Sequence, residues 1–133
     1  MKRVWSRVDV EAPLDEVWEL LVAIRYWPVW GPSVRAVDLA AERIGPGTKG
    51  RVQTAIGVWL PFEITRFEPQ SYWDWNVAGV GATGHRVTPL SERRTRVEFS
   101  VPWVLAPYRA VLALGLRRLK ALAEERTRRS ETA

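Results

Sequence analysis

The sequence predicts an α+β fold in which a curved antiparallel sheet of six to seven strands wraps around a long C-terminal helix. Residues 102–129 form the one stretch with a long helical period of apolar residues. Residues 34–101 instead show short alternating runs separated by turn residues, which is typical of strands joined by hairpins. A helix with an apolar face needs a covering surface, and here only the sheet can provide it.

The chain begins with a strand and two short helices. Residues 2–10 alternate and predict the first strand. Pro13 then opens a helix, because the first helical position needs no N–H donor. The prolines within residues 25–32 forbid a long helix and predict a short helical turn. The first helix is expected to bury Leu14, Val17, Trp18 and Leu21, and the turn carries Trp27 and Trp30.

Six further strands are expected in the middle of the chain. They lie at residues 34–41, 51–56, 62–65, 72–77, 85–88 and 96–101. The segment Gly79–Gly84 matches the G-x-G-x-x-G pattern of dinucleotide sites, but a strand follows it where such a site needs a helix. We therefore interpret it as a glycine-rich hairpin turn.

The C-terminal helix has a narrow apolar face with a glycine at its centre. Glycine inside a helix costs about 1 kcal/mol relative to alanine. Gly115 therefore either leaves room for a ligand or an opposing indole, or allows close packing of the helix on the sheet. The face consists of Val104, Tyr108, Val111, Leu112, Gly115, Leu119 and Leu122. We expect one domain over residues 1–133, with a frayed tail after about residue 127.

Composition excludes several classes of function. The chain has no cysteine and one histidine, which excludes disulfides and thiolate catalysis and argues against a transition-metal site. We expect no metal and no cofactor. The net charge is +5, but arginines alternate with acids, so we expect a solvated surface and no nucleic-acid partner. No signal peptide or bilayer-spanning run is visible, so we expect a cytoplasmic protein without integral membrane association.

His85 and the tryptophans are the side chains that bear on function. His85 shares strand parity with Val87 and should face the apolar side of the sheet. There it acts as a general base, or it is a buried histidine bonded to a neighbouring polar group or carbonyl. The eight tryptophans likewise either fill the core or line a cavity for a flat apolar ligand.

In order and spacing, these elements resemble the START-like (SRPBCC) superfamily, in its polyketide cyclase/dehydrase-like branch. The resemblance covers nearly the whole chain, and no catalytic motif transfers residue by residue. It implies the helix-grip fold, with a cavity between the sheet and the C-terminal helix that holds a lipid, aromatic or polyketide-like molecule. The matching segments are residues 12–21, 26–30 before Pro32, 45–50, 84–86 with 89–90, and 95–97.

The candidate ligand-binding residues come from both sides of this expected cavity. His85 is the only catalytic candidate among them. The set is Trp27, Trp30, Phe62, Ile64, Trp73, Trp75, His85, Val87, Phe99, Tyr108, Leu112, Gly115 and Leu119.

Three functions remain open from the sequence. The first is binding of a small apolar molecule. The second is a cyclase or dehydratase, with His85 as general base and Arg66 or Tyr108 polarising a carbonyl. The third is an interaction protein without a small ligand, in which Trp5 and Tyr72 on the outer sheet face favour a homodimer. A cavity of roughly 300–1,000 Å³ with polar groups favours the first two functions, and a filled core favours the third.

Overall fold

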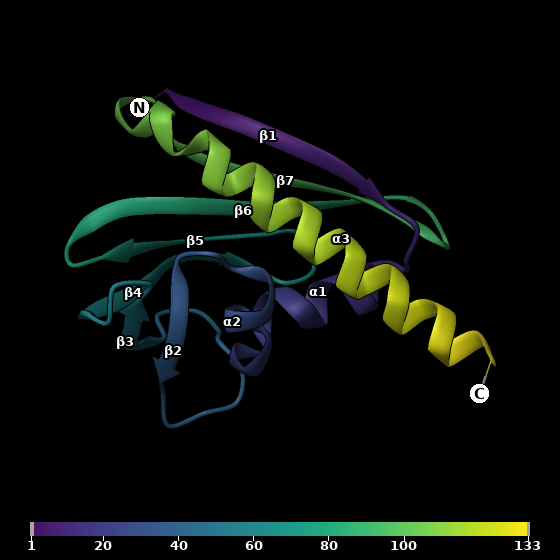
Figure 1. The fold of residues 1–133 in the computed structure, drawn as a ribbon, viewed down its shortest axis with the longest axis horizontal. Coiled ribbons are helices and arrows are strands. Elements are labelled where there is room, and N and C mark those ends of the chain that lie inside the picture. Colours follow the sequence, from purple (N-terminus) through teal and green to yellow (C-terminus); the bar gives the residue numbers. More distant parts are fainter. Residues whose placement is uncertain (1, 133) are drawn as a thin grey trace.

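The computed structural model describes residues 2–132 and confirms the α+β fold with its curved antiparallel sheet (Figure 1). Seven strands pair in the order β1-β7-β6-β5-β4-β3-β2, so β2 to β7 form a meander and β1 adds to its last strand. The strands are Arg3–Val10 (β1), Val34–Asp38 (β2), Lys49–Thr54 (β3), Trp59–Glu68 (β4), Tyr72–Val77 (β5), Val80–Ser91 (β6) and Arg94–Pro102 (β7).

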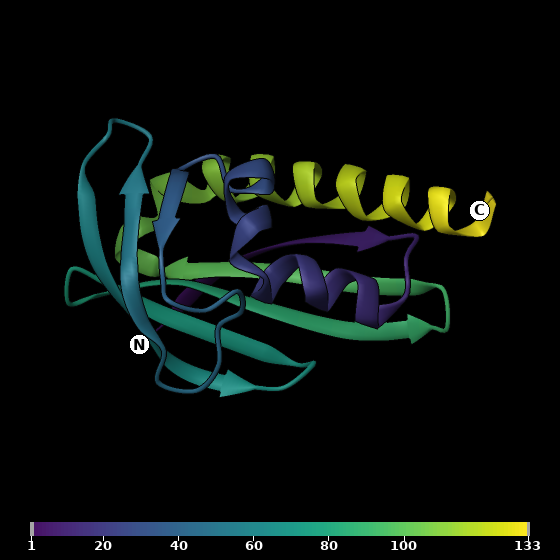
Figure 2. The same cartoon turned by 90° about the horizontal axis from the view of Figure 1, so that it is seen from below.

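All the helices lie on one face of the sheet (Figure 2). The first strand leads into α1 (Leu14–Val22), a short 3-10 turn η1 (Ile24–Tyr26) and α2 (Trp27–Trp30), as the two expected short helical segments. The chain ends in a second 3-10 segment η2 (Trp103–Tyr108) and the long helix α3 (Arg109–Thr132). Helix α3 packs directly on β1 and β7, and α1 and α2 pack on the same face of the sheet beside it, so the core lies between one layer of helices and the sheet (Figure 2).

The turn between β5 and β6 is much shorter than predicted. Ala78 and Gly79 both have positive φ, 53° and 78°, which is the geometry of a two-residue type I′ hairpin. The prediction of a turn over residues 79–84 is therefore wrong, since β6 begins at Val80. Gly84 lies inside this strand, and glycine is needed there because a Cβ would collide with the hydroxyl groups of Tyr72 and Ser100.

The strand predicted over residues 51–56 is displaced toward the N-terminus. It begins at Lys49 and ends at Thr54, and Ile56 is 86% exposed in the turn that follows. Gly57 has a φ of 90°, which places the reversal of the chain here. The alternation of apolar residues in the sequence thus extends beyond the strand into the turn. The prediction that Ile56 belongs to the strand is therefore wrong.

The last helix does not begin at residue 102. Residues 103–108 form 3-10 turns, because Pro107 has no N–H to donate and Leu105 has non-helical angles (φ −102°, ψ 20°). Val104, expected on the inward face, is 59% exposed, whereas Leu116 and Ala123 are buried. Helix α3 continues to Thr132, and its residues from 128 to 132, where we expected fraying, are exposed.

Polar contacts fix α3 against β1 and α1. The Lys120 ammonium donates to the Asp9 carbonyl oxygen at 2.8 Å and to the Glu124 carboxylate at 2.6 Å. The same carboxylate accepts the Glu11 backbone N–H at 2.8 Å. Arg126 pairs with Glu16 of α1. The position of α3 over the sheet, and hence of η2 before it, is set by these contacts and by the buried leucines.

Arginine side chains cover aromatic rings on the outer face of the sheet. The Arg86 guanidinium lies 4.6 Å from the Trp5 ring centroid and 5.3 Å from that of Tyr72, and Arg66 lies 4.8 Å from Tyr72. The Tyr72 hydroxyl donates to Asp74 at 2.9 Å, and Tyr72 is only 4% exposed. Tyr72 therefore lies on the outer face, as its parity predicted, but the arginine side chains cover its ring and leave little of it for contact with a second copy.

Candidate ligand-binding site

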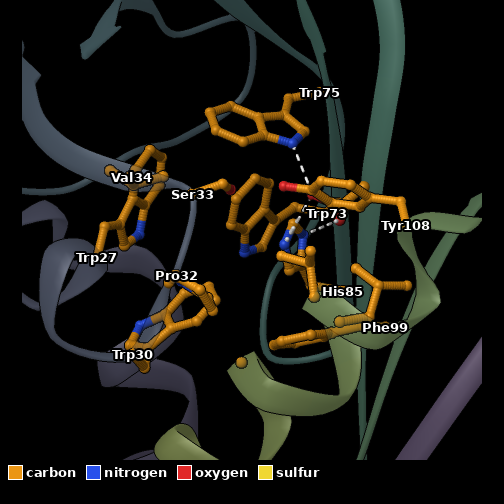
Figure 3. Close-up of a pocket in the computed structure, with 15 residues that line it drawn as sticks. Trp27, Trp30, Pro32, Ser33, Val34, Trp73, Trp75, His85, Phe99 and Tyr108 are labelled. Carbon is orange, nitrogen blue, oxygen red and sulfur yellow. Dashed lines mark hydrogen bonds between the residues drawn. The ribbon is translucent and has the colours of Figure 1, made fainter. Parts of the chain in front are cut away.

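A small inner cavity of about 50 Å³ lies between the sheet, α2 and the first turns of α3 (Figure 3). It offers room for one or two water molecules, since each occupies about 30 Å³ in the liquid. The structure brings together here a large part of the predicted set, namely Trp27, Trp30, Trp73, Trp75, His85, Phe99, Tyr108, Leu112 and Gly115.

Four predicted residues lie outside this cavity. Phe62, Ile64, Val87 and Leu119 are at most 3% exposed and belong to the hydrophobic core. They line neither the inner cavity nor the larger one described next.

A larger outer cavity of about 580 Å³ lies beside the inner one, under η2. Strands β2 to β7 contribute Val34, Val52, Thr54, Leu60, Trp75, Val77, Ala82, Thr83 and Val101, the turn between β3 and β4 contributes Ala55, Ile56 and Val58, and Ser33, Leu105 and Tyr108 complete the lining. Both cavities share Ser33, Val34, Trp75, Thr83 and Tyr108, so these five residues form the boundary between them.

Most residues of the outer cavity were not predicted from the sequence. Only Trp75 and Tyr108 belong to the predicted set. Thr83 shares strand parity with His85 and would have been identified if residues 79–84 had been assigned to a strand. Ile56 and Val58 lie at a hairpin turn, and Leu105 lies in a 3-10 segment, so neither a strand period nor a helix period identifies them.

A chain of hydrogen bonds runs along the boundary between the cavities. The Trp75 indole N–H donates to the Thr83 hydroxyl oxygen at 2.8 Å, and this hydroxyl lies 3.3 Å from His85 Nε2. His85 Nδ1 lies 3.2 Å from the Trp73 carbonyl oxygen, which can only accept. The proton of neutral His85 is therefore on Nδ1, and Nε2 accepts from Thr83.

Burial makes His85 a weak base. The side chain is 3% exposed, and desolvation lowers its pKa from 6.5 to about 3. Its ring is stacked on Trp73 at a centroid distance of 3.8 Å, and Phe99 meets it edge-on at 4.9 Å. This environment corresponds to the buried, hydrogen-bonded histidine of the two interpretations. A base with so low a pKa removes protons poorly at neutral pH.

We expect His85 to make the protein acid-sensitive. The unfolded state takes up a proton below pH 6.5 and the folded state does not, so the free energy of unfolding falls as the pH falls. At pH 5 the free energy of unfolding should be roughly 2 kcal/mol lower than at pH 8. Urea unfolding at the two pH values measures it. In His85→Gln the loss should be much smaller, because glutamine does not titrate; an equal loss in both proteins would contradict this assignment.

The two groups considered for polarising a carbonyl lie in different places. Tyr108 borders both cavities, and Figure 3 shows its hydroxyl directed toward the rings of Trp73 and Trp75. Arg66 instead lies over Tyr72 on the outer face and pairs with Glu68. The hypothesis that Arg66 acts inside the cavity is therefore wrong, because the sheet lies between them.

Trp73 carries a buried donor without a partner. Its indole nitrogen is not exposed to solvent, and its N–H donates a hydrogen bond to no group in residues 2–132. The indole nitrogens of Trp27 and Trp30, in contrast, donate to the carbonyl oxygens of Leu21 and Leu20 at 2.9 and 2.8 Å. A buried donor left unpaired costs about 1–3 kcal/mol, so an acceptor that reaches it is favoured.

Gly115 leaves space for a methyl group between α3 and the segment after α2. A Cβ added there would lie 3.4 Å from the Pro32 ring and 3.6 Å from Phe99, which are ordinary contact distances. We therefore expect Gly115→Ala to stabilise the protein by up to about 1 kcal/mol through helix propensity while narrowing the inner cavity. Urea unfolding tests this. Gly115→Val should destabilise the protein, because its extra methyl groups would collide with the side chains that surround the Cβ position. Destabilisation by Gly115→Ala would contradict the expectation.

The structure describes two further features of residues 2–132. No helix in this part of the chain is long and apolar enough to cross a bilayer. Likewise, no three His, Cys, Asp or Glu side chains within it gather closely enough to hold a metal ion.

Comparison with known proteins identifies a sequence family and many proteins of similar fold. Residues 1–124 match the family described as polyketide cyclase / dehydrase and lipid transport. A search of curated proteins gave no match.

Three solved structures illustrate the similarity of fold. The Zhui aromatase/cyclase from a Streptomyces species is 16% identical, with a TM-score of 0.71 and 94% of each chain covered. The XoxI protein of Bacillus cereus is 14% identical, with a TM-score of 0.72 and 92% of this chain and 96% of that one covered. The Aha1 dimer from Colwellia psychrerythraea is 18% identical, with a TM-score of 0.70 and coverages of 93% and 97%. At these identities the similarity concerns the fold alone.

Proposed function

Because the chain belongs to the polyketide cyclase / dehydrase and lipid transport family, we propose that it binds a small, mainly apolar molecule in the outer cavity. The observation that carries the proposal is the cavity itself. Its volume of about 580 Å³ falls within the roughly 300–1,000 Å³ of small-molecule sites, and its lining is mostly aliphatic and aromatic. Apolar surface buried there stabilises a complex by about 25 cal/mol per Å².

The lining also favours a ligand with a neutral polar end. Neither cavity is lined by a Lys, Arg, Asp or Glu side chain. Burying a carboxylate without a partner is costly, so a charged end group is disfavoured. At the inner end, the hydroxyl groups of Ser33, Thr83 and Tyr108 border the cavity, with the unpaired Trp73 N–H beyond them. A hydroxyl or carbonyl oxygen at one end of the ligand fits this arrangement.

We favour a binding function over a catalytic one. The cyclase hypothesis needs a base beside the ligand, and His85, the single histidine of the sequence, lines the inner cavity and not the outer one. Its lowered pKa and its two hydrogen bonds suit a structural role that holds Thr83 in position.

The proposal can be tested with neutral and charged probes of one shape. Nile red reports an apolar site by its fluorescence, and decanol and decanoate compete for it. We expect decanol to displace Nile red more strongly than decanoate does, and tryptophan emission to change, because Trp75 borders the cavity. Absence of Nile red binding, or equal displacement by both competitors, would argue against the site as proposed.

Thr83→Val tests the polar end of the site. The variant keeps the shape of the side chain and removes the hydroxyl, so decanol should bind about 2–10-fold more weakly. The melting temperature should also fall, because the Trp75 N–H and His85 Nε2 lose their partner. Thr83→Ser should restore both properties. Thr88→Val, an exposed position on the same strand, is the matched control; an equal loss of decanol affinity there would refute the role of Thr83.

A further inference from the structure

We propose that the end of the molecule around the outer cavity docks onto the surface of anionic lipid bilayers. Most of the large exposed apolar side chains of residues 2–132 gather at this end. Trp103 and Val104 are 58% and 59% exposed, which is unusual for side chains of this size. We call the set the apolar rim: Ile56, Val58, Val80, Trp103, Val104 and Leu105.

Three segments that are distant in the sequence supply the rim. They are the β3–β4 turn, the start of β6 directly after the β5–β6 turn, and η2, and both views place them at the same end of the molecule (Figure 1, Figure 2). Ile56, Val58 and Leu105 also line the outer cavity. The rim therefore adjoins the outer cavity, and its exposed apolar area is continuous with the cavity lining at these three residues.

The charged residues in the rim segments and in their neighbours along the sequence are all basic. The rim segments and their neighbours, residues 2–4, 33–36, 54–60, 76–82 and 100–110, contain no Asp or Glu. They contain four basic residues, Lys2, Arg3, Arg35 and Arg109, none of which forms a salt bridge in the described part of the chain. Helix α3 continues the pattern, since the first acid after Glu98 is Glu124.

The basic groups lie beside the apolar rim. The Lys2 carbonyl oxygen accepts the Trp103 N–H at 3.0 Å, which places the N-terminal strand against η2. The Arg35 guanidinium lies 3.7 Å from the position of a Cβ on Gly57, in the turn between Ile56 and Val58. Arg109 follows η2 directly and is exposed. Each basic residue near an anionic membrane surface contributes about 1 kcal/mol.

Charge complementarity favours a bilayer over a second copy of this chain. Two rims facing each other would bring eight basic groups together with no acid to pair them, which is unfavourable. In an anionic bilayer the basic groups can pair with the phosphates at the surface, while the apolar rim enters the hydrocarbon directly below them. The additional idea that the ligand enters the cavity from this bilayer rests on the proposed function; the docking itself does not.

Flotation with lipid vesicles tests the docking. Vesicles of phosphatidylcholine alone are compared with vesicles of phosphatidylcholine and phosphatidylglycerol in equal amounts. We expect the protein to float with the anionic vesicles only, and the bound fraction to fall at high salt, because salt screens exposed charges. The double variant Trp103→Ser with Val104→Ser should bind at least about tenfold more weakly, since it removes the two most exposed rim residues of η2.

Controls separate this inference from the proposed function. Leu90→Ser replaces an exposed apolar residue outside the rim and should leave flotation unchanged. Nile red binding should persist in the Trp103/Val104 variant, because neither residue lines a cavity. No flotation with anionic vesicles, or equal flotation of the rim variant, would overturn the docking even if Nile red binds. A concentration-dependent dimer that the rim variant abolishes would assign the surface to a second copy instead.

Discussion

Replacing Trp27 by alanine is expected to lower the free energy of unfolding by about 3–5 kcal/mol. Trp27 is 2% exposed and lies at the centre of the aromatic cluster. Its ring is stacked on Trp73 at a centroid distance of 5.4 Å and an angle of 12°, and Trp75 meets it edge-on at 5.3 Å. Its indole N–H donates to the Leu21 carbonyl oxygen, which would lose this partner.

Urea unfolding measures this effect, and two further variants define its origin. Trp27→Phe keeps part of the stacking and loses the hydrogen bond, so an intermediate loss is expected. Trp103→Ala removes an indole that is 58% exposed and should change the free energy of unfolding by less than about 1 kcal/mol. If Trp27→Ala also cost less than 1 kcal/mol, the stacked cluster would not be the centre of the core.

The strands and the long helix were predictable because burial imposes a period on the sequence. Trp73 and Trp75 alternate with Asp74 along β5, and this period of two identifies the inner face without any structural information. The long helix was identified in the same way, from Leu112 and Leu119 on one face.

The errors occur where the backbone, and not burial, determines the structure. The β5–β6 turn needs positive φ at Ala78 as well as at Gly79, and alanine gives no indication of such a conformation in the sequence. Likewise, the prediction of a helix from residue 102 placed Pro107 in its second turn, where the missing N–H interrupts an α-helix, and in the structure α3 begins only after this residue. Both errors concern segments that border the outer cavity.

For the same reason the inner cavity was predicted better than the outer one. The inner cavity is bordered by regular elements whose period reveals the inward side chains, such as Trp73 and Leu112. The outer cavity is bordered by a turn and a 3-10 segment, where Ile56 and Leu105 follow no period. Its size depends on how far η2 lies from β3 and β4, which are distant in the sequence. No local pattern encodes that distance.

Replacing Ala82 by phenylalanine should abolish most of the binding of apolar probes. Ala82 is half-buried on β6 and lines the outer cavity alone, without bordering the inner one. A phenyl ring there occupies space that Nile red or decanol needs. We expect both affinities to fall at least about tenfold, which corresponds to about 1.4 kcal/mol of lost binding free energy. Fluorescence titration of Nile red and its displacement by decanol measure the change.

The stability of this variant should change little, and that distinguishes it from a core substitution. Overpacking of a filled core costs about 1–3 kcal/mol, whereas a ring added to an existing cavity finds space and gains buried apolar contact. Ala121→Phe, at an exposed position on α3, is the matched control and should leave both the melting temperature and the affinities unchanged. Unaltered Nile red affinity in Ala82→Phe would place the binding site outside this cavity. A large fall in melting temperature would instead show that the cavity is closed in solution, because only a filled space resists the added ring.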